Sequence, residues 1–291
     1  MLLSVTNCNI LNRLIQYFQT LEQHPLQRMA ILVGSLLFFW IIEGAIPLLT
    51  LKYKKTKLRY AVLNFSFTLM HLVIHTFLAI LIIKLSDWCL HHKFGLGYWL
   101  HTNTLATIVT AFLTLDFFGG WLVHIAQHRA LFLWRVHIIH HADNNVDFTT
   151  GLRHRPVESL LRGIFFFMGI IFSGAPIYAV MIFQTLLITA VGFTHANISL
   201  PRWLDNVLSY VLIPPNMHKV YHHWKQPFTD SNYRAILSVW DRMLGTFKKL
   251  KPEEIHYGMD RYYPNEQDEN FMKLLKSPFN KTDGKHPIKL S

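Results

Sequence analysis

The sequence predicts an all-α fold: an integral-membrane bundle of about four helical spans, the last one a hairpin, with a cytoplasmic helical cap. Of the 291 residues, 51% are hydrophobic and only 15% are charged, whereas soluble domains carry about 25% charged residues. Several apolar runs approach or reach the roughly 20 residues that a helix needs to cross a bilayer. Histidines cluster at the ends of these runs, so the cap is expected to carry them.

The net charge of +11 is explained by membrane topology, without nucleic acid as a partner. The basic residues flank the apolar runs, and cytoplasmic loops of membrane proteins are enriched in Lys and Arg. The two cysteines, Cys8 and Cys89, form neither a zinc nor a redox motif and are too few for a disulfide framework. Imidazole is therefore the metal-binding group that the chain offers in number.

Residues 1–104 are expected to hold an amphipathic helix and the first two spans. Residues 1–28 lack the features of a cleaved signal peptide. Their helical periodicity suits either a helix in the membrane interface or an ordinary helix packed on the bundle. The first span is predicted at residues 29–50, and its one charge, Glu43, is expected to pair inside the bundle.

A cationic loop at residues 52–59 has five basic residues and no acid, so the positive-inside rule places it in the cytoplasm. The second span, residues 61–83, then returns to the outer side. Its two histidines, His71 and His75, are expected to pack or to form hydrogen bonds inside the bundle. Residues 84–101 are predicted to be an outer loop or a surface helix, so the histidines there lie away from the main clusters.

The third span begins near Asn103 and is expected to run beyond the membrane surface, carrying the first histidine group at its cytoplasmic end. The apolar run 160–193 is broken by a Ser-Gly-Ala-Pro sequence at 173–176. At about 1.5 Å per residue each arm is marginal for a full crossing, which indicates a hairpin. All the main histidine groups then lie on one face of the membrane.

Three groups of histidines follow helical spacing: His124-x-x-x-His128, His137-x-x-His140-His141 and His218-x-x-x-His222-His223. Residues three or four apart share one face of a helix, so each group presents two imidazoles to one point. A lone histidine such as His154 is usually a packing residue. Three groups within a hundred residues, near apolar spans, indicate a metal site.

Ligand type alone leaves zinc, iron and copper open. Ligand number favours two ions, because a mononuclear zinc enzyme uses about three protein ligands and a water, whereas this chain offers eight or nine imidazoles. Two redox-active irons beside a bilayer would suit the oxidation of a lipid C–H bond by dioxygen. The expected ligands are His124, His128, His137, His140, His141, His195, His218, His222 and His223.

Five ordered motifs carry a family resemblance. They are His124-x-x-x-His128, Leu133-Trp-Arg-Val-His137-x-x-His140-His141-Ala-Asp143, Asp147-Phe-Thr-Thr150, His195-Ala-Asn197, and Asp230-Ser-Asn-Tyr233 with Trp240-Asp-Arg-Met-Leu-Gly-Thr-Phe247. Together they resemble the fatty acid hydroxylase/sterol desaturase superfamily of histidine-box di-iron oxidases. The resemblance covers about residues 105–250, and its last stretch is also similar to alkylglycerol monooxygenase.

The resemblance implies a membrane oxidoreductase with two iron ions, dioxygen as co-substrate and a fatty acyl, sterol or ether lipid as substrate, in lipid metabolism. It also implies a separate electron donor, which could be a small haem protein, a ferredoxin or a reductase. Residues 105–250 would be the catalytic domain and residues 251–291 a cytoplasmic tail. The membrane would be the plasma membrane in a bacterium or the endoplasmic reticulum in a eukaryote.

Two positions depart from the family pattern. Tyr221 stands where the third histidine box, His-x-x-His-His, has its first paired histidine. Arg155 stands where many relatives have a histidine before Pro156, and His154 comes one place early, so it is left out of the ligand set. His223 is expected to replace the missing imidazole; otherwise one metal is under-ligated.

Four polar residues near the boxes are candidates to orient imidazole N–H groups: Asp143, Asp147, Asn197 and Asp230. Capping of helices and turns is an equally good interpretation of each.

Three other functions stay open. A metal transporter would need ligands along a path near mid-membrane, a degenerate scaffold would follow from the loss at Tyr221, and a zinc hydrolase would need a general base that the motifs do not show.

Overall fold

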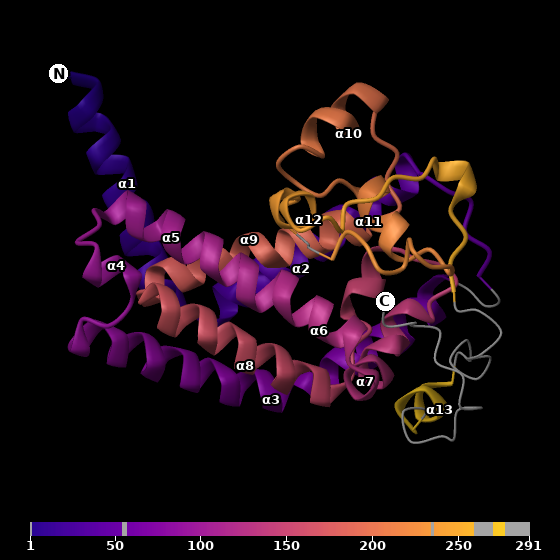
Figure 1. Cartoon of the computed structure of the whole chain (residues 1–291), viewed down its shortest axis with the longest axis horizontal. Helices are drawn as coiled ribbons and strands as arrows, with labels where there is room; N and C mark the ends of the chain where they lie inside the picture. Colours follow the sequence, from indigo (N-terminus) through magenta and orange to yellow (C-terminus); the bar gives the residue numbers. More distant parts are fainter. Residues whose placement is uncertain (1, 54–56, 234–235, 259–269, 277–291) are drawn as a thin grey trace.

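The computed structural model describes residues 2–53, 57–233, 236–258 and 270–276 (Figure 1). Within these ranges every named element is a helix, so the predicted all-α class is confirmed. The α-helices are α1 (Leu2–Thr20), α2 (Pro25–Ala45), α3 (Lys57–His92), α4 (Leu96–Trp99), α5 (Thr104–Asp116), α6 (Val123–Arg129), α7 (Leu131–His141), α8 (Pro156–Ser173), α9 (Ile177–His195), α10 (Arg202–Leu208), α11 (Pro215–Tyr221), α12 (Val239–Met243) and α13 (Phe271–Lys276). Short 3-10 turns lie at Leu21–Gln23, Phe148–Leu152 and Pro252–Glu254, and a π-helical turn lies at Phe117–Leu122.

Five segments of the described chain are long and apolar enough to cross a membrane. They are Pro25–Ala45, Lys57–Trp99, Thr104–Arg129, Pro156–Ser173 and Ile177–His195. Large apolar side chains cover their outer surfaces; Leu69 and Val73 on α3 are 73% and 78% exposed. Such a surface is stable in lipid but not in water. The protein is therefore an integral membrane protein, with three spans and a hairpin of two further helices.

Helix α3 is longer than the sequence predicts. It continues through residues 84–92, where an outer loop or a surface helix was expected. The reason is burial: Ser86 and Cys89 are 2% and 0% exposed, and Cys89 belongs to a core cluster with Ala111 and Ile170. The last turns of α3 thus pack against the bundle.

The hairpin of α8 and α9 turns at Gly174, whose φ of 71° lies in the left-handed region. Its N–H bonds to the Ile170 carbonyl at 2.8 Å, which caps α8. A Cβ at this position would lie 2.4 Å from the Phe94 carbonyl oxygen, so the close approach also requires glycine. The hairpin predicted from the break at 173–176 is confirmed.

The third span is one continuous helical rod of α5, the π-helical turn and α6. The π-helical turn contains Gly119, where a Cβ would lie 2.9 Å from the Phe166 ring of α8. Beyond this turn, α6 carries His124 and His128. The rod therefore delivers two histidines to the end of the bundle, as predicted.

The cap lies at one end of the bundle. Figure 1 shows α6, α7, α11 and α13 gathered there, with α4 at the opposite end beside the α8–α9 turn. The buried Glu43 of α2 ties the bundle to the cap: it pairs with Lys57 at 2.5 Å and accepts hydrogen bonds from the backbone N–H groups of Phe148 and Asn197, both at 3.1 Å. The pairing expected for Glu43 is confirmed.

Residues 54–56 of the predicted cationic loop and residues 259–269 and 277–291 of the predicted tail lie outside the described residues.

Candidate metal centre

Two groups of buried histidines lie side by side in the cap. The quartet is His140, His195, His218 and His222; the trio is His128, His137 and His141. Within each group the ligand atoms all lie within 4.8 Å of one another. Helix α7 supplies His137, His140 and His141, and the others come from α6, α9, α11 and the residue that follows α11. The structure thus brings together seven of the nine predicted ligands.

The quartet faces its imidazole nitrogens toward one point. His195 Nε2 lies 3.2 Å from His140 Nε2 and 3.0 Å from His218 Nε2. His195 Nδ1 lies 2.9 Å from the Val191 carbonyl and therefore carries the hydrogen, which leaves a lone pair on Nε2. Two nitrogens bound to one metal at about 2.1 Å, as in zinc–histidine sites, lie about 3.0–3.4 Å apart at angles of about 90–110°. The observed spacings match that range.

His222 is the clearest sign that a cation belongs here. Its side chain is fully buried, and neither ring nitrogen has a hydrogen-bond partner. A buried polar group without a partner costs about 1–3 kcal/mol. A metal held by the quartet would bind one of these nitrogens and remove part of that cost.

Carboxylates orient two histidines of the trio. His137 Nδ1 lies 2.9 Å from Glu158 Oε1, and His128 Nδ1 lies 2.9 Å from Asp230 Oδ1. A carboxylate only accepts, so each Nδ1 carries the hydrogen and each Nε2 presents its lone pair to the interior. His141 Nε2 lies 3.1 Å from His128 Nε2, which again matches two ligands of one metal.

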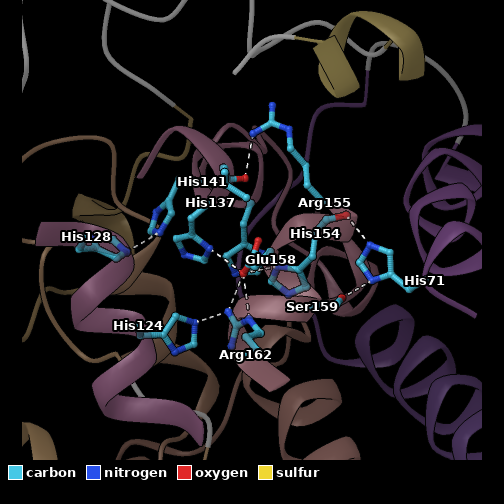
Figure 2. A network of polar contacts seen from close by, with 12 residues as sticks. His71, His124, His128, His137, His141, His154, Arg155, Glu158, Ser159 and Arg162 are labelled. Carbon is cyan, nitrogen blue, oxygen red and sulfur yellow. Dashed lines mark hydrogen bonds and ion pairs between the residues drawn. The ribbon is translucent and has the colours of Figure 1, made fainter. Parts of the chain in front are cut away.

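Glu158 is the hub of the network in Figure 2, where it faces His137, His154 and Arg162. These two histidines and Glu158 could by spacing hold a cation of their own. However, Glu158 Oε1 also accepts two hydrogen bonds from Arg162, at 2.9 and 2.8 Å. The guanidinium occupies the place of a cation, so Glu158 serves to orient His137 and this group is not a third metal site.

The backbone of His154 is held by a histidine of the membrane-spanning helix α3. Its backbone carbonyl accepts a hydrogen bond from His71 Nε2 at 3.0 Å, and Ser159 lies 2.9 Å from His71 Nδ1 (Figure 2). The hydrogen-bonding role expected for His71 and His75 is confirmed, since His75 Nε2 also lies 3.3 Å from Ser159 Oγ. This contact fixes the segment that leads into Glu158.

Two predicted ligands lie outside both groups. His124 Nε2 accepts from Arg162 at 2.7 Å, with its ring 5.4 Å from that of His137. His223 turns away from the centre: its Nδ1 accepts from the His256 backbone N–H at 3.2 Å and its ring packs on Phe228. The expected replacement of the missing imidazole by His223 has no geometric support.

Of the four predicted orienting residues, Asp230 alone contacts a histidine ring in the described structure. Asp147 caps the Phe148–Leu152 turn and accepts from Tyr53 at 2.7 Å. Asp143 accepts from the Asn145 backbone and Thr150, and Asn197 bonds to the Leu49 backbone. For these three residues the capping interpretation describes the geometry.

Sequence reasoning missed Glu158, Arg162 and Lys219. Glu158 follows His154 by four residues, a spacing at which a histidine and a carboxylate often pair, so this signal was present. Lys219 gave no signal, although its side chain is fully buried and donates to the carbonyls of Val146 and His195. It thereby fixes the end of α9 next to the quartet.

Burial sets the protonation of the cap. It lowers the pKa of His137 to about 3, against the opposing effect of Glu158, and burial with nearby Lys219 lowers the pKa of His218 to about 3. Burial also holds the pKa of His222 well below its ordinary value and raises the pKa of Tyr221 well above its own. At neutral pH these imidazoles are uncharged, the form that binds metals.

Comparisons with known proteins agree with the geometry. Residues 108–246 match the fatty acid hydroxylase family. Alkylglycerol monooxygenase of Homo sapiens is 28% identical over 155 residues, which are 53% of this chain and 33% of that protein. The same enzyme of Xenopus tropicalis is 31% identical over 151 residues, or 51% and 32% of the two chains.

A bacterial relative aligns over more of the chain. Ornithine lipid hydroxylase OlsE of Rhizobium tropici is 24% identical over 193 residues, which are 66% of this chain and 56% of that protein. The chain thus spans about a third of the length of the two monooxygenases and about half of the bacterial hydroxylase. No solved structure matches the chain.

Proposed function

We propose that the protein is a membrane-bound oxidoreductase that inserts oxygen into a lipid C–H bond, because residues 108–246 match the fatty acid hydroxylase family. The single observation that carries the proposal is the buried quartet and trio of histidines at one end of a membrane bundle. The similarity to an alkylglycerol monooxygenase and to an ornithine lipid hydroxylase supports the same reaction class.

The proposed cofactor is a pair of iron ions, one held by the quartet and one by the trio. Iron held there would supply the activation of dioxygen, with electrons from a separate donor. Histidine ligands alone do not choose iron over zinc; the choice rests on the family.

The protein's own groups prepare this centre. Glu158 and Asp230 hold His137 and His128 with their Nε2 lone pairs directed inward, so both rings are oriented before a metal arrives. Arg162 neutralises Glu158 and also donates to His124. The packing of the cap buries these ligands, because every histidine of the two groups is at most 4% exposed.

The orientation proposed for the protein places the histidine cap in the cytoplasm. The basic residues of the chain support it, since Lys52 precedes α3, and Lys57 and Arg59 lie in its first turn, at the same end as the cap. A soluble electron donor would then reach the cap from that side. The lipid would come from the bilayer, where the bundle already lies.

The rival functions fit the geometry less well. A transporter needs metal ligands along a path through the membrane, whereas both histidine groups lie at one end. A non-catalytic scaffold would have no need of a fully buried His222 with two unpartnered nitrogens. A zinc hydrolase needs a carboxylate free to act as general base, and Glu158 is bound to Arg162.

The test uses the whole chain, purified in detergent with iron supplied. We expect about two irons per chain, and oxygen consumption coupled to oxidation of an alkylglycerol or of the acyl chain of an ornithine lipid when a chemical reductant is present. His140→Ala should retain the helical bundle but lose both iron at the quartet and activity. Lipid oxidation by the His140→Ala variant at the original rate would overturn the assignment, as would metal uptake into sealed vesicles without oxidation.

A further inference from the structure

The side chain at position 221 lies between the two histidine groups of the candidate metal centre. Tyr221 is fully buried, and its ring contacts both histidine groups, with centroids 4.4 Å from His141 and 5.1 Å from His218 and His222. We propose that the Tyr221 phenol oxygen is a metal ligand that completes the trio as a three-histidine, one-phenolate site. The inference rests on the metal binding of the proposed function and assigns a ligand that none of the histidine boxes supplies.

The distances place this oxygen at the position of a fourth donor. Tyr221 Oη lies 3.1 Å from His128 Nε2 and 2.6 Å from His137 Nε2. The first distance matches the spacing of about 3.0–3.4 Å between two atoms that share one metal. The second is that of a short hydrogen bond, which a metal would lengthen by entering between the two atoms.

The hydrogens of the trio show what a cation would replace. His128 and His137 have no hydrogen on Nε2, because their Nδ1 atoms face carboxylates. In the metal-free site the phenol therefore donates to His137, and His141 Nε2 donates to His128. Two hydrogens thus fill the space in which three ring nitrogens and one phenol oxygen converge.

Metal binding exchanges these hydrogens for one cation. The phenol O–H bond breaks, its proton leaves to solvent, and the oxygen–metal bond forms. The hydrogen of His141 moves from Nε2 to Nδ1, which lies 3.4 Å from Thr229 Oγ1. No electron is transferred, and a ferric ion with one phenolate leaves a net charge of +2 among neutral imidazoles.

His223 cannot fill this role, because its ring lies against Phe228 and His256. The fourth donor at position 221 is therefore an oxygen where the family pattern has a nitrogen. An anionic oxygen ligand favours ferric iron over zinc and softer metals. The trio and the quartet are thus chemically different sites.

The experiment is absorption and resonance Raman spectroscopy of the full chain in detergent, loaded with iron and oxidised to the ferric state. The expected signature is a phenolate-to-iron charge-transfer band in the visible range with phenolate ring vibrations. Tyr221→Phe should abolish the band and reduce the iron content from about two toward one per chain. Tyr221→His should restore the second iron without the band.

The matched control is Tyr233→Phe, because Tyr233 is equally buried and its ring lies 5.0 Å from that of His128; this variant should keep the band. Size exclusion and thermal unfolding identify any variant that fails to fold. The inference is overturned by two irons without the band in the natural chain, by a band that persists in Tyr221→Phe, or by failure of the natural chain to bind a second iron. A normal band without any lipid oxidation would instead contradict the proposed function alone.

Discussion

The imidazoles of the cap differ in what their second ring nitrogen contacts. His195 is set by a backbone carbonyl, His137 and His128 by carboxylates, and His222 by nothing that the described structure contains. The adjacent residue, His223, has its own partner in the His256 backbone. Neighbouring histidines of one sequence motif therefore have different environments, so substituting each one separately should distinguish their contributions to metal binding.

The first prediction compares these two neighbours. We expect His222→Ala to lose about one metal per chain, because the quartet loses a buried ligand atom, and His223→Ala to keep its metal content. Elemental analysis of both variants, purified alike, is the measurement. Equal loss in the two variants would show that His223 contributes a ligand after all.

The second prediction concerns Glu158. We expect Glu158→Gln to weaken metal binding at the trio about 10–100-fold, the usual effect of losing a group that orients a metal-bound histidine. The reason is that a neutral amide no longer selects the His137 Nδ1–H form and no longer balances Arg162. Chelator competition measures the affinity, and Glu253→Gln, at an exposed position, is the matched control. An unchanged affinity for the metal would show that Glu158 does not orient a metal ligand.

Helical spacing in the sequence predicted which faces of α6, α7 and α11 carry histidines. It could not separate His222 from His223, because both follow His218 by about one helical turn and α11 ends at Tyr221. Nor could it join Glu158 to His137, because 21 residues and a loop separate them. The ligand set as a whole stays a prediction.

At the scale of helices, the bundle depends on a few close approaches. Gly119 lets the π-helical turn meet Phe166, and Gly174 lets the hairpin meet the loop after α3. The apolar pattern predicted the hairpin, since a Gly-Ala-Pro sequence cannot continue a helix smoothly. It missed the end of α3, because Ser86 and Cys89 become buried through contacts with distant helices that the local sequence does not contain.

The third prediction tests the hairpin turn. We expect Gly174→Ala to destabilise the protein by more than about 1 kcal/mol, because φ is 71° and a Cβ would lie 2.4 Å from the Phe94 carbonyl oxygen. The midpoint of thermal unfolding in detergent should fall. Gly34→Ala is the control, since no atom lies within 4 Å of the added Cβ. The same midpoint in both variants would refute the account of the turn.

At the scale of the whole molecule, composition and hydropathy predicted the all-α membrane class, and the histidine motifs predicted the match to the fatty acid hydroxylase family. These properties are sums over many residues, so one misplaced loop does not change them. The position of the metal centre at one end of the bundle follows from topology. The crowding of seven buried imidazoles around Tyr221 does not, because it depends on how helices far apart in sequence pack together.

The fourth prediction follows from that crowding. Removing metal with a chelator should lower the midpoint of thermal unfolding, because the cap buries nitrogens that only a cation can satisfy. Iron at a hundred times its dissociation constant should restore about 2.7 kcal/mol. In the His140→Ala variant the recovery should be smaller. No metal dependence in the natural chain would mean that the cap folds independently of metal.

His140 and His141 are consecutive residues of α7, yet the first faces the quartet and the second the trio. One peptide bond therefore links the two groups, so an ion bound at one group would restrict the backbone that carries a ligand of the other. Iron uptake should accordingly be cooperative, with doubly loaded chains forming at the expense of singly loaded ones. Native mass spectrometry during a substoichiometric titration would reveal this as a deficit of the one-iron species.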